Sequence, residues 1–325
     1  MIKNLLDLEQ TKVSCDLKDY SMMIVGESGI GKTELAVDIY GRDRTLVLAF
    51  ESSISGISDI YGVEIDSYST LMSYLLQLQN PSVREKFDTI VIDTIFLLDH
   101  YIEKSITDAY NVDILSDALK YNKAYKIVDK RFLDILKKLQ KMGYTLCYIA
   151  HPAMKKVKVR ENEIETYVPK VSDRVKNLLL PEVDIRLFCF TDENNDRKIA
   201  TRKSFVYPDA RCRVAELSPV IDFNAKTLHE EFKKAMTDKS ENGGTIVAKK
   251  EKVKEESASF EELMNKVKEL GQKATEKNKV AEANKILASN LGRTDDGTPR
   301  KLSDITPTMT ETLKVIVLEL ENLLK

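Results

Sequence analysis

Residues 26–33 form the segment GESGIGKT, a glycine-rich turn between an apolar stretch and a helical one. Residues 21–25 are nearly all apolar, and the TELAVDIY that begins at Thr33 is typical of a helix. Glycine at positions 26, 29 and 31 allows the backbone to curl closely around an anion. The pattern GxxxxGK[ST] between a strand and a helix therefore predicts a phosphate-binding loop.

The chemistry of such a loop assigns a role to each part of the motif. Successive backbone N–H groups and the N-terminus of the following helix would surround a β-phosphate. The Lys32 ammonium would neutralise β- and γ-oxygens, and the Thr33 hydroxyl would bind Mg²⁺. The alternative is a chance glycine-rich turn. The predicted nucleotide-binding residues are Gly26, Glu27, Ser28, Gly29, Ile30, Gly31, Lys32 and Thr33.

Three further polar residues follow apolar strand candidates. Asp93 follows TIVI and would hold Mg²⁺ through water, or would cap the next helix. Glu51 follows TLVLAF and would polarise an attacking water, or would be an ordinary loop carboxylate. His151 follows TLCYIA and would contact a γ-phosphate, or would be structural. Parallel strands would bring all three to the edge with the phosphate loop.

Short apolar runs alternate with longer helical stretches over residues 21–189, which predicts an α/β fold with a mainly parallel sheet flanked by helices. Two later strands, at residues 184–190 and 198–206, are expected to form a hairpin that extends the sheet. The expected parallel strands are residues 21–25, 45–50, 89–92 and 145–150. The expected helices are residues 32–40, 69–78, 94–107 and 116–141.

The 325 residues are enough for about two domains. Residues 237–257 are rich in Gly, Lys, Glu and Ser and are predicted to be a linker between a core, residues 1–236, and a helical module, residues 258–325. In that small all-α module, apolar residues recur at helical spacing, Gly271 and Gly292 are candidate helix ends, and Pro307 suits the first turn of the last helix.

Composition excludes several classes of protein. The net charge of −2 gives no bulk attraction to nucleic acid or membrane, so such contacts need a local patch. The four cysteines are too widely spaced for a zinc site, and reduced thiols in an intracellular protein are expected. No apolar run approaches the roughly 18 residues of a membrane span. We therefore expect a cytoplasmic protein without a membrane partner.

The order of the segments GESGIGKT, AFE, TIVIDT and YIAH resembles the RecA-like ATPases, most closely the phage-encoded recombination ATPases of the Sak type. The resemblance covers about residues 18–234. It implies a RecA-like P-loop NTPase core that uses ATP and Mg²⁺, with Glu51 as the catalytic glutamate and Asp93 as the Mg²⁺-associated aspartate. His151 stands where RecA has a γ-phosphate-sensing glutamine, so the residue type departs from the family there.

The resemblance also implies oligomers in which basic residues of the late hairpin reach a neighbouring subunit's nucleotide. Arg202 and Lys203 are the best candidates, with Arg197, Lys198 and Arg211 as rivals. A solvated hairpin face is the alternative. Loops that follow the position of His151 contact DNA in RecA-like proteins. The basic residues in this place, which is predicted to be a mobile loop, are Lys155, Lys156, Lys158 and Arg160, although glutamates follow them.

Two functions remain open at this point. The first is an ATP-hydrolysing recombination protein that binds single-stranded DNA as a homo-oligomer in an infected bacterial host. The second is a nucleotide-gated helicase loader or packaging accessory whose main partner, such as a single-strand-binding or replication protein, docks on the C-terminal helices. A small-molecule kinase is disfavoured. Strand order distinguishes a RecA-like fold from a kinase fold, because a RecA-like sheet places residues 145–150 between the phosphate-loop strand and the Asp93 strand.

Overall fold

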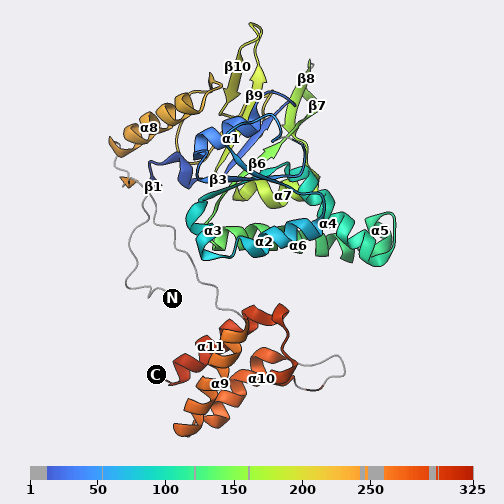
Figure 1. Ribbon diagram of the computed structural model, residues 1–325, viewed down its shortest axis with the longest axis vertical. Coiled ribbons are helices and arrows are strands. Elements are labelled where there is room, and N and C mark those ends of the chain that lie inside the picture. Colours follow the sequence, from blue (N-terminus) through green and yellow to red (C-terminus); the bar gives the residue numbers. More distant parts are fainter. Residues whose placement is uncertain are drawn as a thin grey trace. The chain divides into compact units, whose positions relative to one another are not determined.

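A computed structural model of the chain describes residues 13–241, 246–247 and 260–324, except positions 53, 121, 160–161, 293–297 and 299. The chain forms two compact units, Met1–Glu255 and Glu256–Lys325. The first unit is built around a mostly parallel sheet (Figure 1) whose strand order is β12-β10-β9-β2-β6-β5-β3-β4, with β11 paired to β9. Its strands are β2 (Met22–Gly26), β3 (Thr45–Ala49), β4 (Tyr61–Glu64), β5 (Thr89–Asp93), β6 (Thr145–Ala150), β9 (Ile185–Thr191), β10 (Arg197–Ala200), β11 (Arg211–Cys212) and β12 (Val220–Asp222).

The order of the central strands confirms the RecA-like expectation. Strand β6 pairs in parallel with β2 on one side and with β5 on the other, so β2 and β5 are not neighbours. Strand β3 then pairs with β5, with Ala49 opposite Asp93. Since parallel strands end at one edge, the loops after β2, β3, β5 and β6 all leave the sheet at the same edge.

Helices cover both faces of the sheet, which is why its strands are apolar without alternation. Met22 and Ile24 of β2 pack with α1 and α8 on one face, whereas Met23 and Val25 pack with α2, α4, α6 and α7 on the other. Figure 1 shows this arrangement. The helices are α1 (Lys32–Tyr40), α2 (Tyr68–Gln77), α4 (Ile95–Tyr110), α6 (Lys123–Lys141), α7 (Asp173–Leu179) and α8 (Ala225–Glu241), with the shorter α3 (Pro81–Lys86), α5 (Leu115–Ala118), η2 (Leu17–Asp19) and η3 (Leu180–Glu182).

Three predicted elements differ from the structure. The helix expected over residues 116–141 is two helices, α5 and α6, because the backbone of Asn122 is left-handed (φ 56°) and begins α6 afresh. Strand β10 ends at Ala200 rather than at residue 206. The segment after His151, predicted to be a mobile loop, is an antiparallel hairpin of β7 (Pro152–Val159) and β8 (Asn162–Pro169).

The predicted linker begins too early. Helix α8 continues to Glu241 because Leu228, Phe232 and Met236 form one buried stripe that fixes it to the sheet. Beyond it, β13 (Ile246–Val247) pairs in parallel with β1 (Val13–Ser14), and the Cys15 N–H donates to the Val247 carbonyl. The remaining linker positions, 242–245 and 248–257, lie outside the described residues.

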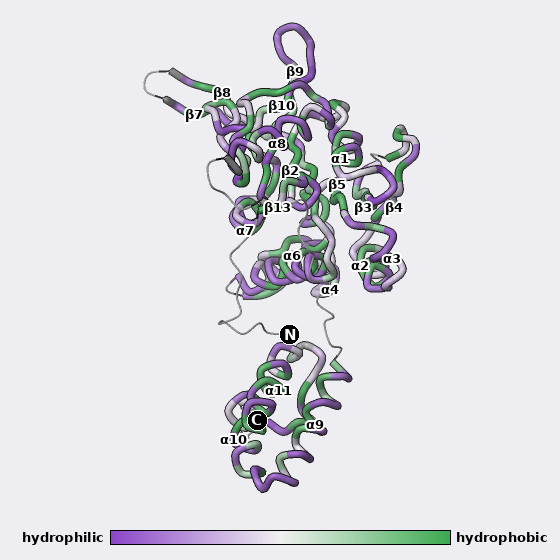
Figure 2. Tube along the Cα trace, turned by 90° about the vertical axis from the view of Figure 1, so that its left-hand side faces the viewer, coloured by the Kyte–Doolittle hydropathy of each residue, from purple (hydrophilic) through white to green (hydrophobic). Residues whose placement is uncertain are grey.

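The second unit contains the predicted helices. Its elements are α9 (Phe260–Glu276), α10 (Val280–Leu291), η4 (Leu302–Asp304), η5 (Pro307–Met309) and α11 (Thr310–Leu324). Leu263, Val267, Leu313 and Ile316 are among its core residues, and Figure 2 shows hydrophobic and hydrophilic segments alternating along these helices. Gly292 ends α10 as expected. The expectation for Gly271 is wrong, because α9 continues to Glu276.

None of the helices in the described parts of the chain has the length and apolar character that crossing a membrane requires.

Candidate nucleotide-binding site

The loop between β2 and α1 has the backbone shape of an anion cradle. Gly29 and Gly31 adopt positive φ angles of 79° and 99°, a region that side-chain-bearing residues avoid. Gly26 is required for another reason, because a Cβ there would lie 2.9 Å from the Cys189 carbonyl oxygen on β9. The N-terminus of α1 begins at Lys32, where its free N–H groups and dipole favour a negative charge.

The Lys32 ammonium is buried at the base of this loop. Its Nζ donates to the Glu27 carbonyl oxygen at 2.8 Å, and the residue is 6% exposed. Burial lowers the pKa of Lys32, whereas the nearby carboxylates of Asp93 and Glu51 act in the opposite direction. A buried cation is costly unless anions compensate it, so a polyphosphate in the loop would add favourable charge to the site.

Thr33 and Asp93 meet at the centre of the site. The Thr33 hydroxyl donates to Asp93 Oδ2 at 2.7 Å, and Asp93 is 2% exposed at the end of β5. Thr94, not Asp93, is the N-cap of α4, so the helix-cap interpretation of Asp93 is wrong. Hydroxyl and carboxylate oxygens suit Mg²⁺, which usually takes only one or two carboxylates together with phosphates and water. Within the described segments, no group of three or more His, Cys, Asp or Glu residues could hold a metal ion.

Glu51 and His151 form a second cluster beside this pair. His151 Nε2 lies 3.2 Å from Glu51 Oε2, and the Thr94 hydroxyl donates to Glu51 Oε1 at 3.0 Å. The two side chains are about one-third exposed, so water can reach them. The carboxylate is thus held in place from two strands while remaining open on the solvent side, a geometry that can orient a water molecule.

The late hairpin places one of the rival basic residues against the phosphate-binding loop of its own chain. Arg202 donates from Nε to the Leu217 carbonyl oxygen, and both Arg202 and Lys203 are exposed beyond the end of β10. Arg197, named only as a rival, instead donates from Nη1 to the Ile30 carbonyl oxygen at 3.1 Å within the same chain. Its guanidinium lies 4.7 Å from the ring centre of Phe223.

Local sequence pattern does not predict the contacts made by Thr94 and Phe223. Thr94 is identified only when β3 and β5 are paired, because that pairing places Glu51 within reach of its hydroxyl. Phe223 follows β12, whose place beside β10 brings the ring to Gly31. These contacts depend on strand order rather than on local pattern.

The basic residues after His151 lie on the β7–β8 hairpin. Lys155, Lys156 and Lys158 are all exposed, and Arg160 lies outside the described residues. Lys156 and Lys158 stand opposite Glu165 and Glu163 in the ladder, and Lys156 Nζ lies 3.7 Å from Glu163. Exposed ion pairs of this kind contribute little, so these lysines stay available to another anion.

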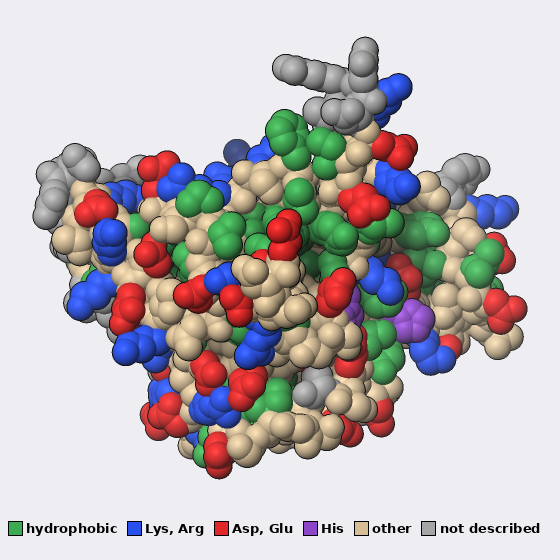
Figure 3. All heavy atoms as spheres, turned by 90° about the horizontal axis from the view of Figure 1, so that it is seen from above, with side chains coloured by type: hydrophobic (Ala, Val, Ile, Leu, Met, Phe, Trp, Pro, Cys, Tyr) green, Lys and Arg blue, Asp and Glu red, His purple; other side chains and the backbone are tan. Residues whose placement is uncertain are grey.

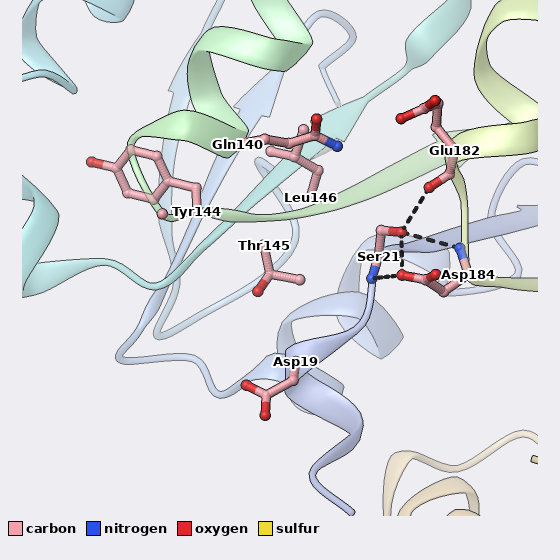
Figure 4. A pocket seen from close by; sticks show the side chains of 9 residues that line it. Asp19, Ser21, Gln140, Tyr144, Thr145, Leu146, Glu182 and Asp184 are labelled. Atoms are coloured by element: carbon pink, nitrogen blue, oxygen red, sulfur yellow. Dashed lines mark hydrogen bonds between the residues drawn. The ribbon is translucent and has the colours of Figure 1, made fainter. Parts of the chain in front are cut away.

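A cavity of about 290 Å³ opens at the opposite end of the strands (Figure 4). It is lined by three acidic residues, Asp19, Glu182 and Asp184, and the Ser21 hydroxyl at its edge donates to Asp184 at 2.8 Å. Its negative charge and its distance along β2 from the phosphate-binding loop make it unsuitable for a triphosphate.

The strand order, the glycine loop and the buried Lys32, Thr33 and Asp93 define the protein as one of the P-loop nucleotide-binding class. A family model described as an AAA domain, AAA_24, matches residues 18–229, more than half of the chain. The chain therefore belongs to this family of P-loop ATPases.

The proteins similar to the chain include a prophage protein and a recombinase of known structure. The SPbeta prophage-derived uncharacterized protein YorG of Bacillus subtilis (strain 168) is 24% identical over 293 residues, which cover 86% of this chain and 88% of that protein. The crystal structure of the RadB recombinase matches 58% of this chain and 83% of its own, at 12% identity and a TM-score of 0.35. The finer resemblance to Sak-type recombination ATPases stays a prediction.

Proposed function

We propose that the protein is a Mg²⁺-dependent ATPase that acts on single-stranded DNA as a homo-oligomer, in phage recombination or replication in the host cytoplasm. The observation that supports hydrolysis is the convergence of three strand ends beside the phosphate-binding loop: Asp93 after β5, Glu51 after β3 and His151 after β6. A site that only bound nucleotide would need the loop and Asp93 but not the solvent-open carboxylate of Glu51.

In the proposed reaction the loop amides and Lys32 hold the β- and γ-phosphates. Thr33 and Asp93 would hold the Mg²⁺ ion that supplies charge neutralisation on those phosphates. Glu51 orients a water molecule and receives its proton as the water oxygen bonds to the γ-phosphorus. The bond from that phosphorus to the bridging oxygen breaks, giving ADP and phosphate. His151 fixes the Glu51 carboxylate and reports on the γ-phosphate. A basic residue of a neighbouring copy, Arg202 or Lys203, completes the charge stabilisation.

The proposal for DNA rests on the β7–β8 hairpin, which begins directly after His151. Three exposed lysines there, with an exposed Met154 before them and an exposed Val157 among them, suit a chain that offers both phosphates and bases. The prophage origin of the YorG relative agrees with a role in phage DNA metabolism.

The deciding experiment is ATP turnover measured with and without single-stranded DNA across a protein titration. We expect DNA to stimulate turnover and specific activity to rise with protein concentration, because the basic residue comes from another copy. Turnover that is absent under all conditions would refute the ATPase proposal. A turnover rate that is the same with and without DNA would refute the DNA part of the proposal. A specific activity that does not change with protein concentration would refute the oligomer part.

A loader function is the second candidate, because Glu256–Lys325 is a compact unit with its own core and could dock a replication or single-strand-binding protein. The same titration separates it. A loader would show turnover that DNA leaves unchanged and that a partner protein alters.

Removing charge from the hairpin should weaken DNA binding. We expect the combined Lys155→Ala, Lys156→Ala and Lys158→Ala variant to bind single-stranded DNA at least about 10-fold more weakly, and the slope of log affinity against log salt to fall by about 2, since each phosphate contact on a single strand contributes about 0.7. Fluorescence anisotropy over a salt series measures both quantities.

The matched control replaces three exposed lysines of α6, Lys123, Lys126 and Lys130, with alanine. It removes the same charge from a helix that packs on one face of the sheet, and it should leave the salt slope of DNA binding unchanged. Equal losses in the two variants would show that net charge, not the hairpin, governs binding.

A further inference from the structure

A second cavity, of about 190 Å³, lies beside the phosphate-binding loop. Gly26, Glu27 and Ile30 form its wall on the loop side, and Pro152, the first residue of β7, forms part of the hairpin side. The rest is mainly aromatic, with Tyr167, Phe188, Phe190 and Tyr207 lining it. Viewed from the end at which β8 and β10 project, hydrophobic side chains gather in the middle of the face among charged ones (Figure 3).

The aromatic rings are arranged to accept another flat ring. The Tyr207 ring centre lies 5.2 Å from that of Phe190, 5.5 Å from that of Phe188 and 6.1 Å from that of Tyr167, with interplanar angles of 31° to 37°. Phe188 is 2% exposed and forms a fixed base, whereas the other three rings are only partly buried. Tilted rings around an open space provide faces on which a planar group can stack.

Polar groups at the rim could recognise the edge of such a ring. The Glu27 carboxylate is exposed, and the Thr191 hydroxyl lies at the end of β9. Burial, with smaller contributions from Tyr167 and Glu27, raises the pKa of Tyr207 to about 12, so its hydroxyl remains a donor at neutral pH. A carboxylate acceptor and hydroxyl donors match the amino and carbonyl groups of a nucleobase.

The lysines of the hairpin lead to this cavity. Lys155, Lys156 and Lys158 follow Pro152 along β7, and Tyr167 of β8 stands opposite Met154 at the same end of the ladder. A nucleic-acid backbone tracked by these lysines would pass the mouth of the aromatic cavity. The arrangement combines a basic track with a stacking platform, as expected for single-strand binding.

We propose that this cavity takes one unstacked base of single-stranded DNA and reports its presence to the nucleotide site. The proposal rests on the proposed DNA function and names its base-binding site. The contact path is short: Glu27 lines the cavity, and its carbonyl oxygen accepts the hydrogen bond from Lys32 Nζ at 2.8 Å. A base that displaces Glu27 therefore alters the position of Lys32.

The test compares a single-stranded oligonucleotide with an abasic oligonucleotide of the same length, using wild-type protein and Tyr207→Leu. Base stacking contributes a factor of about 5 to 150 in affinity per base. We expect the wild type to prefer the base-containing strand by a factor in this range, and Tyr207→Leu to lose most of the preference while keeping its salt slope. Tyr110→Leu, at an exposed tyrosine of α4, is the matched control and should behave as wild type. Phe190→Leu gives a second variant if Tyr207→Leu does not fold, as judged by thermal melting.

Each other outcome has a distinct meaning. If neither strand binds, the DNA function fails. If both strands bind the wild type equally and stimulate turnover equally, the DNA function stands but the base site is overturned. If Tyr207→Leu weakens binding of a fluorescent ATP analogue instead of DNA, the cavity takes the base of the nucleotide and the proposal is wrong. If Tyr207→Leu loses self-association, the occupant of the cavity is a neighbouring copy of the chain and the proposed base site is overturned.

Discussion

Replacing Lys32 with alanine is expected to lower the rate of nucleotide turnover by about 100- to 1,000-fold or more. Lys32 is the buried cation of the phosphate-binding loop, and its Nζ lies among the Glu27 carbonyl and the carboxylates of Asp93 and Glu51. Without it, the loop would retain backbone donors but would lose the charge that balances those carboxylates and the phosphates. A phosphate-release assay at saturating nucleotide and Mg²⁺ measures the loss.

The control for this variant is Lys226→Ala, which removes an exposed lysine from α8. It should turn over nucleotide at the wild-type rate. Thermal melting of both variants shows whether either has lost its fold. Wild-type turnover in Lys32→Ala would contradict the assignment of this loop as the site of hydrolysis.

The second large effect is expected from Glu51→Gln. Glutamine keeps the shape of the side chain and can still accept the hydrogen bond from Thr94, but it cannot take a proton from water. We therefore expect nucleotide affinity to stay within a few-fold of wild type while turnover falls by about 100- to 10,000-fold. Binding of a fluorescent nucleotide and single-turnover hydrolysis separate the two effects.

Glu64→Gln is the matched control, because Glu64 ends β4 at the same edge of the sheet. It should leave both affinity and turnover unchanged. Normal hydrolysis by the Glu51→Gln variant would show that another group positions the water, and His151 is the nearest candidate.

The sequence was most informative where the chemistry depends on strand ends. The glycine motif and the polar residues after three apolar strands were enough to place Lys32, Asp93 and Glu51 at one edge, since parallel strands share that edge. Side-chain contacts across strands could not be predicted in this way. Arg197 reaches Ile30 only because β10 lies beside β9 and so approaches β2, a relation that local pattern does not contain.

Element boundaries were predicted less well for a related reason. Leu270 and Ala274 are both buried in the core of the second unit. Because their packing stabilises the helix on both sides of Gly271, α9 continues past that residue. The β7–β8 hairpin was missed because its lysines and glutamates resemble a solvated charged run, whereas ladder pairing of the two segments makes them strands. In both cases tertiary packing overrides local propensity.

The hydrogen bond between Lys32 and Glu27 has a consequence for the proposed ATPase cycle. The loop itself supplies an acceptor that positions the ammonium, so part of its conformational freedom is lost on folding rather than on nucleotide binding. In the proposed cycle, binding of ATP would exchange one acceptor, the Glu27 carbonyl, for phosphate oxygens, and release of product would restore it. The loop would therefore return to its starting arrangement after each proposed turnover without reorganising the chain around it.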